Sequence, residues 1–317
     1  MGFWTDKSVV LTGGTGFLGS HIAEILTAEG ARVFVPRKRD YNLMRLEDGL
    51  RCFLEHRPEI VIHGAAFYGG IWINQVFPGR IYYENLVMGA NVIEACRLAS
   101  VKKFVGIGTA CSYPGYLEGM LSEDRLWDGP LHETVRNYGL TKKMMQVQCW
   151  AYRKQYDFHG IHLILTNLYG PRDSYNPQRS HVVAALIRKF VEAADGKQSQ
   201  VEVWGTGQPV REFLFVEDCA QAVVLAAEKY DDVEPLNIGT GIGTSIRELA
   251  EMIHEISGFQ GVIRWNPEKP DGQMVKILDV SRMKNVLNWA PPTNLRTGLE
   301  KTIRWYRENK ASADAKF

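Results

Sequence analysis

Short apolar runs alternate with helical patterns along the first half of the chain. Five apolar runs predict strands, within SVVLTGG, ARVFVP, EIVIHGAA, KKFVGIGT and IHLILTNLYGP. Between them, apolar residues recur with a helical period, notably over residues 45–56, 85–99 and 137–155. Strands separated by helices at this spacing predict a parallel sheet covered on both faces, which binds its ligands beyond the carboxyl ends of the strands.

The regular alternation weakens after about residue 167, where prolines and polar residues interrupt it in YGPRDSYNPQRSH. Further strands are expected in VEVWGTGQPVREFLFVED, PLNIGT and GVIRW, and further helices over residues 181–194, 219–230, 245–257 and 295–309. We therefore predict an α/β fold, with a Rossmann doubly wound parallel sheet and a smaller α/β substrate-binding domain. The dinucleotide-binding domain is expected at residues 1–166 plus 210–232, and the substrate-binding domain at 167–209 plus 233–317.

The charge balance argues against nucleic acid or an anionic membrane as the main partner, because 37 Lys and Arg face 36 Asp and Glu. The five cysteines form no CxxC pair and no metal-ligand spacing, which predicts free thiols in a reducing compartment and no metal. The N-terminal sequence lacks a signal-peptide pattern, and no apolar run reaches the roughly 18 residues that a membrane span needs. We expect a cytoplasmic protein.

The segment TGGTGFLG has the glycine spacing of a dinucleotide-binding loop. Gly13, Gly16 and Gly19 recur at every third position, after the first predicted strand and at the start of a helix. Such glycines permit a tight turn and a close approach of the backbone to a pyrophosphate, whose charge the helix N-terminus attracts. The alternative is a purely structural turn, but the strand before the loop and the helix after it favour dinucleotide binding.

The second predicted strand ends in PRKRD, which bears on the choice of dinucleotide. An Asp or Glu at this place binds the ribose hydroxyls of NAD, whereas an Arg accommodates a 2′-phosphate. Arg37, Lys38 and Arg39 come first here, and the acid is displaced to Asp40. We predict NADP, with Arg39 or Arg37 on the phosphate and NAD as the alternative. A solvated basic loop is the competing interpretation.

Tyr138 and Lys142 in NYGLTKK lie four residues apart, hence on one face of a helix. An ammonium beside a phenol is expected to lower the pKa of Tyr138 towards the range of a general acid or base. Together with the glycine loop and Thr109 at the end of a strand, this pair resembles the extended short-chain dehydrogenase/reductases. The resemblance implies that Thr109 binds the substrate oxygen, Tyr138 exchanges a proton and Lys142 holds the nicotinamide ribose. It also implies that Asn85 supports the active-site region, unless it is an ordinary helix cap.

Further motifs narrow the resemblance to the GDP-L-fucose synthases, which are GDP-4-keto-6-deoxymannose 3,5-epimerase/4-reductases. These motifs are TACSYP, TNLYGP, SHVVAALIRKF, VWGTGQPVREFLFVED and KPDGQ. The resemblance implies that Cys111 and His181 are the base and acid of epimerisation. A 4-keto group acidifies the hydrogens on carbons 3 and 5, so one group must remove each proton and another must return it on the opposite face. The alternatives are a small buried cysteine and a capping or surface histidine.

The resemblance also implies the binding residues. Cofactor contacts are expected from Gly13, Gly16, Phe17, Leu18, Gly19, Arg37, Arg39, Asn42, Leu43, Ala65, Ala66, Lys142, Asn167 and His181. Substrate contacts are expected from Asn167, Lys189, Trp204, Arg211 and Lys276, with Arg211 on the diphosphate. Core packing is the alternative for Trp204, and an ion pair with Glu212 or Asp218 is the alternative for Arg211.

The leading prediction is an NADP(H)-dependent 3,5-epimerase and 4-reductase of a nucleotide sugar, GDP-linked by the resemblance. One alternative is an epimerase without net reduction, similar to GDP-mannose 3,5-epimerase. A second is a 4-keto reductase for a different deoxy sugar, because the loop AAFYGGIWINQ is bulky. A non-catalytic NADP-sensing scaffold is the third. A homodimer through the helices at 85–99 and 137–155 is also implied.

Overall fold

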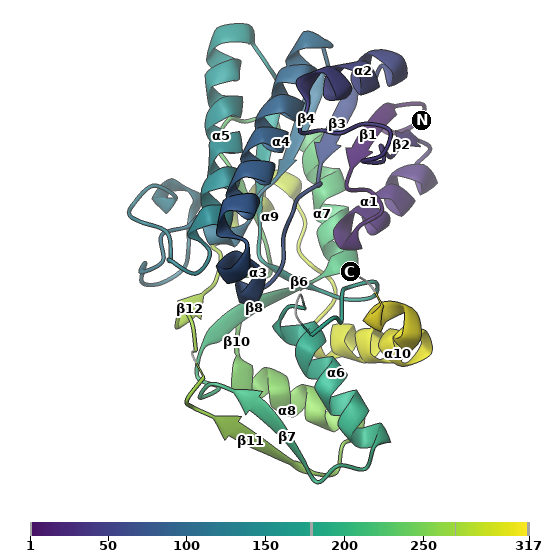
Figure 1. The fold of residues 1–317 in the computed structure, drawn as a ribbon. Helices are drawn as coiled ribbons and strands as arrows, with labels where there is room; N and C mark the ends of the chain where they lie inside the picture. Colours follow the sequence, from purple (N-terminus) through teal and green to yellow (C-terminus); the bar gives the residue numbers. More distant parts are fainter. Residues whose placement is uncertain (1, 178–179, 270, 316–317) are drawn as a thin grey trace.

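The computed structural model describes residues 2–177, 180–269 and 271–315; Pro270 of the KPDGQ motif lies outside them. A larger part of the molecule is built on one sheet and its covering helices, and a smaller part lies at one end of it (Figure 1). The larger sheet has six parallel strands in the order β2-β1-β3-β4-β5-β9. They are β1 (Ser8–Thr12), β2 (Arg32–Phe34), β3 (Ile60–His63), β4 (Lys103–Ile107), β5 (Gly160–Leu165) and β9 (Leu236–Ile238).

Helices cover both faces of this sheet, which explains why its strands are nearly continuous apolar runs. One face carries α1 (Phe17–Ala28), α7 (Val216–Lys229) and α9 (Ser281–Leu287). The other carries α2 (Leu46–His56), α4 (Pro78–Leu98) and α5 (Arg136–Tyr156). The strand order reverses between β1 and β3, and a ligand in such a sheet binds at the carboxyl ends of these two strands. The predicted fold class is therefore confirmed.

The smaller part combines two small sheets with three helices (Figure 1). One sheet joins β10 (Gly243–Ser245), β8 (Val210–Phe215) and β12 (Val275–Lys276), and β6 (Asn167–Tyr169) also pairs with β8. The other pairs β7 (Gln200–Trp204) with β11 (Val262–Asn266). Their apolar side chains pack with α6 (Val182–Asp195), α8 (Ile246–Ser257) and α10 (Leu295–Asp314) in a core of their own.

Two strands pair differently from what the expected domain boundaries imply. β8 lies in residues 210–232, which were expected in the dinucleotide-binding domain, yet it pairs only within the smaller part. β9 lies in residues 233–317, which were expected in the substrate-binding domain, yet it completes the six-stranded sheet. The chain thus crosses between the two parts more often than its pattern suggests, and a division into two domains stays a prediction.

Short elements complete the chain between the predicted ones. They are α3 (Ile71–Val76) and the 3-10 turns η1 (Ala110–Ser112) and η2 (Glu123–Arg125). Over the described ranges, the search for a helix long and apolar enough to cross a membrane finds none.

Candidate active site

The glycine loop makes a tight connection between β1 and α1. Gly13 has φ +73°, a conformation that favours glycine, and a Cβ there would lie 2.7 Å from the backbone nitrogen of Ala65. A Cβ at Gly19 would overlap the carbonyl oxygen of Gly13. Both positions therefore require glycine, and the loop lies where the strand order reverses, as a dinucleotide-binding turn must.

The N-terminus of α1 fits a pyrophosphate. Gly16 is its N-cap, no side chain caps the helix, and no acidic residue lies in its first turn. The backbone N–H groups of Phe17 and Leu18 are at the start of this helix, where such groups lack intrahelical acceptors. A phosphate at this end gains both hydrogen bonds and the favourable end of the helix dipole.

His63 supports the loops around this site. Its Nδ1 lies 2.7 Å from the hydroxyl of Thr12, and the backbone N–H of Ala65 donates to the same hydroxyl at 3.2 Å. Burial lowers the pKa of His63 to about 3, so the imidazole is neutral. The three residues tie the end of β1 to the segment after β3, where Ala65 and Ala66 are half-buried.

The basic loop after β2 is exposed, as either a phosphate site or a solvated loop would be. Arg37 and Arg39 both face solvent, and Arg39 pairs with its neighbour Asp40 at 3.3 Å. An exposed pair of this kind contributes about 0–1 kcal/mol, so a 2′-phosphate can replace the carboxylate at little cost. Asn42 is half-buried and Leu43 is buried, directly after the loop.

Tyr138 and Lys142 share one face of α5, with Lys142 Nζ 5.9 Å from the centre of the Tyr138 ring. The expectation that the Tyr138 pKa is lowered is wrong. Burial raises this pKa, and the charges of Cys111 and Tyr68 act in the same direction. Lys142 is itself desolvated, and burial lowers its pKa to about 8. Burial thus affects the pKa of Tyr138 more than the attraction to the Lys142 ammonium that the four-residue spacing suggested.

The turn that carries Cys111 is docked directly on α5. Thr109, at the end of β4, caps this turn by accepting a hydrogen bond from Cys111 N at 3.2 Å. The Ser112 hydroxyl donates to Gly139 O at 3.0 Å, and a Cβ at Gly139 would overlap the carbonyl oxygen of Cys111. The glycine next to Tyr138 therefore lets the turn that carries Thr109 and Cys111 lie directly against the part of α5 that carries the phenol.

Cys111 has a cation from the smaller part beside it. Lys276, on β12, donates from Nζ to the Cys111 sulfur at 3.4 Å. Arg211, on β8, is attracted electrostatically to Cys111, and burial lowers the pKa of its guanidinium. The Arg211 Nη1 donates to the carbonyl oxygen of its neighbour Val210 at 2.9 Å.

His181 lies at the N-terminus of α6, and its ring stacks on Tyr68 with 6.2 Å between the ring centres. It is accessible to water, yet the protein around it lowers its pKa by desolvation. Because Tyr68 also acts electrostatically on Tyr138, the imidazole and the phenol border the same region.

Lys189 and Trp204 form a separate group in the smaller part. Trp204 is 61% exposed, so core packing is not its role. The ammonium groups of Lys189 and Lys269 lie 5.5 and 5.4 Å from the centre of its ring. Lys189 also donates to Glu202 O at 2.9 Å. An exposed indole between two cations fits a flat, negatively charged ligand.

Comparisons with known proteins agree with this arrangement. Residues 9–239 match the model of the NAD dependent epimerase/dehydratase family. The chain belongs to this family. It is 39% identical to the GDP-L-fucose synthase of Sinorhizobium fredii over 96% of this chain and 97% of that protein. The predicted resemblance and the prediction of an enzyme are both confirmed.

Solved structures of related proteins share the whole fold. A GDP-L-fucose synthetase from Naegleria fowleri bound to NADP has a TM-score of 0.90 and 26% identity, covering 98% of this chain and 97% of that one. A GDP-6-OMe-4-keto-L-xylo-heptose reductase from C. jejuni also has a TM-score of 0.90, with 28% identity, covering 96% of this chain and 99% of that one.

In this epimerase/dehydratase family member, Glu212 is a residue whose role the sequence reasoning missed. Its buried carboxylate accepts hydrogen bonds from the backbone N–H groups of Thr240, Gly241 and Leu278, at 2.5, 3.0 and 2.7 Å. Asn167 Nδ2 donates to the Glu212 carbonyl oxygen at 2.9 Å. Glu212 thus holds the segments that carry Asn167, Arg211 and Lys276. An acid inside the apolar run of VREFLFVED was the signal.

Asp218, the second ion-pair partner predicted for Arg211, is also engaged with other groups. Asp218 accepts hydrogen bonds from the backbone N–H and the hydroxyl of Thr293, at 2.9 and 3.0 Å. It therefore fixes the chain before α10 against α7. Both carboxylates proposed as ion-pair partners of Arg211 are engaged elsewhere, and its guanidinium interacts electrostatically with Cys111 and Asp271 instead.

Asn85 clamps the loop after β3 in this family member. It lies inside α4, so it is not a helix cap, and it exchanges hydrogen bonds with both backbone groups of Phe67 at 2.8 and 2.9 Å. This clamp fixes the segment that leads to Tyr68.

Among the cysteines, Cys111 is half-buried, and the four predicted to be core residues are buried: Cys52, Cys96, Cys149 and Cys219.

Proposed function

We propose that the chain is an NADP(H)-dependent 3,5-epimerase and 4-reductase that converts GDP-4-keto-6-deoxy-D-mannose to GDP-L-fucose. The observation that carries the proposal is the docking of the Cys111 turn on α5 beside Tyr138. A thiol for proton removal and a phenol for carbonyl reduction then address one sugar. The names of the related proteins, GDP-L-fucose synthase and NADP-bound GDP-L-fucose synthetase, support the substrate and the cofactor.

NADPH, when bound, supplies the hydride that carbon 4 of the sugar receives. The residues present fit this cofactor: the glycine loop and the N-terminus of α1 suit the pyrophosphate, and Arg37 and Arg39 suit the 2′-phosphate. We assign the nicotinamide ribose to Lys142, whose pKa of about 8 leaves it largely charged at neutral pH. Asn42, Leu43, Ala65 and Ala66 are proposed as further cofactor contacts.

Epimerisation is a proton exchange between Cys111, the sugar and His181. The Cys111 thiolate removes a proton from carbon 3 or carbon 5, so that a C–H bond breaks, an S–H bond forms and the electron pair moves to the carbonyl oxygen. Thr109 and Tyr138 stabilise this oxygen by hydrogen bonds. The protonated form of His181 then gives a proton to the opposite face of the carbon as the carbonyl double bond re-forms, and exchange with water restores the proton on the imidazole and removes the one on the thiol before the second carbon reacts.

Reduction uses Tyr138 as the proton donor to the oxygen on carbon 4. The raised pKa of Tyr138 keeps the phenol protonated, which is the state that a donor requires. We assign the sugar diphosphate to Arg211 and Lys276, and the exposed group at Trp204 and Lys189 to the nucleotide end of the substrate. Asn167 and His181 are also proposed to contact both the cofactor and the nucleotide sugar.

The test is a reaction of the purified enzyme with GDP-4-keto-6-deoxy-D-mannose and NADPH in heavy water. We expect one NADPH oxidised per sugar and deuterium at carbons 3 and 5 of the product, measured by absorbance and NMR. Deuterium without NADPH oxidation identifies the epimerase without net reduction. NADPH oxidation without deuterium leaves only the reductase.

A reductase of a different GDP-linked 4-keto sugar is the second candidate. Tyr68, whose ring stacks on His181, is 43% exposed on the loop after β3, and Trp72 is 42% exposed on the following helix α3. The similarity to a GDP-heptose reductase supports this candidate. Parallel assays with a GDP-4-keto-heptose distinguish the two, since kcat/KM is expected to favour the true substrate.

We also propose a cytoplasmic homodimer. Tyr82 and Tyr83 on α4, and Trp150 and Tyr156 on α5, are exposed aromatic side chains on neighbouring helices. Two copies pairing these helices would bury them in a four-helix contact. Light scattering coupled to gel filtration measures the mass, and Tyr83→Glu with Trp150→Glu is expected to give a monomer.

A further inference from the structure

We propose that Lys276 is a positioning residue that hydrogen-bonds the Cys111 sulfur in the enzyme without substrate and stabilises the negative charge that this sulfur carries when it acts as a base. This inference deepens the proposed function, since it names what prepares the base of epimerisation. The direct observation is the hydrogen bond from Lys276 Nζ to the Cys111 sulfur at 3.4 Å. An ammonium beside a cysteine sulfur stabilises the negative charge of the thiolate, which is the form that can accept a proton.

The register of two strands brings a second cation to the same side. β12 and β8 run parallel with Lys276 opposite Arg211. Residues opposite each other on neighbouring strands point to the same face, so both cations lie on the face turned to Cys111. Arg211 is indeed attracted electrostatically to the thiol. Among the described residues, the charged or titratable groups that interact with Cys111 include Lys276 from β12, Arg211 from β8 and the neutral phenol of Tyr138 from α5.

The nearby acids are engaged elsewhere. Glu212, next to Arg211, accepts three backbone hydrogen bonds in the interior. Asp271 accepts hydrogen bonds from the backbone N–H and the hydroxyl of Thr206, each at 2.8 Å. Neither carboxylate makes a hydrogen bond to Lys276 in the described structure, and the electrostatic attraction of Asp271 is to Arg211 instead.

The backbone fixes Lys276 on both sides. Val210 N donates to Met274 O at 2.7 Å before it, and Leu121 N donates to Ile277 O at 2.8 Å after it. Leu278 N is held by Glu212 at 2.7 Å. A cation anchored in this way is already in place before a ligand arrives, which is the arrangement expected of a group that prepares a base. A lysine that served only the diphosphate would need no contact with the thiol.

The test measures the alkylation of Cys111 by iodoacetamide as a function of pH, without substrate or cofactor. The other four cysteines are buried, so alkylation of the folded protein reports Cys111, and Cys111→Ser gives the background. For Lys276→Met we expect the rate at pH 7 to fall about tenfold and the half-maximal pH to rise by about one unit, because one unit corresponds to a tenfold change in the thiolate population. Lys276→Arg should retain most of the parent rate.

Two comparisons separate this role from a general loss of structure. Lys269→Met removes a lysine from the same part of the molecule, but one that lies over Trp204, and should leave the alkylation profile unchanged. Circular dichroism and NADPH affinity should be those of the parent for every variant. An unchanged profile for Lys276→Met overturns the inference. Because alkylation needs no sugar, this outcome is independent of the deuterium experiment that tests the proposed function.

Discussion

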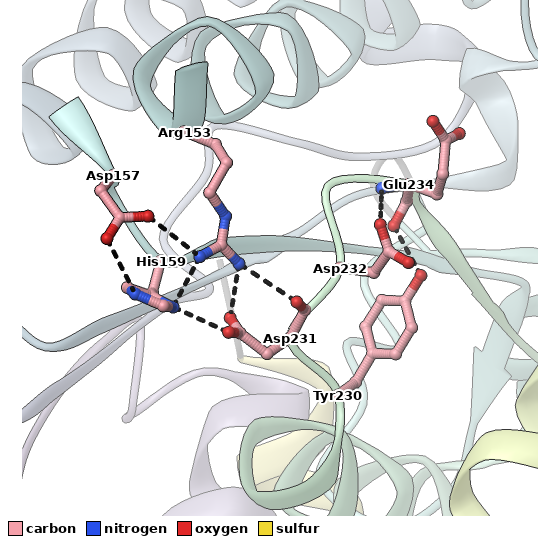
Figure 2. Close-up of polar contacts among 7 residues, drawn as sticks. All are labelled: Arg153, Asp157, His159, Tyr230, Asp231, Asp232 and Glu234. Carbon is pink, nitrogen blue, oxygen red and sulfur yellow. Dashed lines mark hydrogen bonds and ion pairs between the residues drawn. The ribbon is translucent and has the colours of Figure 1, made fainter. Parts of the chain in front are cut away.

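The two ends of the central strands use charge in opposite ways. At the amino ends of β4 and β5, Arg153 Nη2 donates to Asp231 Oδ1 at 2.8 Å, and His159 Nδ1 lies 2.7 Å from Asp231 Oδ2 (Figure 2). Asp157 lies within 4.0 Å of both His159 and Arg153. These side chains form a partly exposed network, in which Arg153 Nη1 also lies 2.7 Å from His159 Nδ1.

At the carboxyl ends, three titratable side chains are desolvated instead of paired with an acid. Burial is the main cause of the raised pKa of Tyr138 and of the lowered pKa values of Lys142 and His181. Groups whose pKa is shifted by burial cluster at sites that move protons, whereas the groups of a paired surface network keep their charges. The proposed chemistry thus lies where ionisation is costly, whereas the network at the amino ends connects elements of the fold.

The largest effect is expected from Tyr138→Phe, which removes the proton donor and leaves the ring. We expect the rate of NADPH oxidation with the 4-keto sugar to fall about 10²- to 10⁴-fold, the usual contribution of a general acid. Deuterium exchange at carbons 3 and 5 should continue at a reduced rate, because Cys111, His181 and Thr109 remain but one hydrogen bond to the enolate oxygen is lost. A rate within a few-fold of the parent would contradict the assignment of Tyr138.

A smaller effect is expected from pH, through Lys142. Its pKa is lowered to about 8, so the ammonium is present below that pH and is lost as pH rises through it. We expect kcat/KM for reduction to fall with this midpoint, since kcat/KM reports groups of the free enzyme. Lys142→Arg keeps its charge and should move the decline to higher pH. A decline at the same pH in both proteins would assign it to another group.

The smallest effect is expected at the amino ends. Asp231→Asn breaks the ion pair with Arg153, and a partly exposed pair contributes about 0.2–1 kcal/mol to the free energy of unfolding. Urea unfolding measures this loss, and kcat/KM should not change. Asp232→Asn is the matched control, because the hydrogen bond that Asp232 accepts from Glu234 N stays within the same loop (Figure 2). A large loss of activity in Asp231→Asn would remove the contrast between the two ends.

For the first half of the chain, the local pattern of residues was enough to predict the strands and the glycine loop. The apolar runs before residue 167 all became strands, and Gly13 and Gly19 lie where a Cβ would clash, because a glycine loop and a βαβ unit are specified by neighbouring residues. The same holds for Tyr138 and Lys142, since four residues make one turn of a helix.

Contacts between distant segments could not be predicted. Lys276 and Cys111 are 165 residues apart, and they meet because β12 pairs with β8 and the residues just after β12 bond to Leu121. The two strands of VEVWGTGQPVREFLFVED do not pair with each other, because each finds a partner from later in the chain. The direction of the Tyr138 pKa shift was also missed, since spacing indicates a neighbouring cation but not the extent of burial.

The carboxylate of Glu212 has a consequence for engineering. It joins β8, the loop after β9 and the chain just after β12, which come from both parts of the molecule. A chimera that takes its sugar-recognising half from a relative must therefore transplant these three segments together. A chimera joined at a single crossover point would leave the buried carboxylate of Glu212 without its backbone N–H donors. Such a hybrid would fail to fold before its selectivity could be measured.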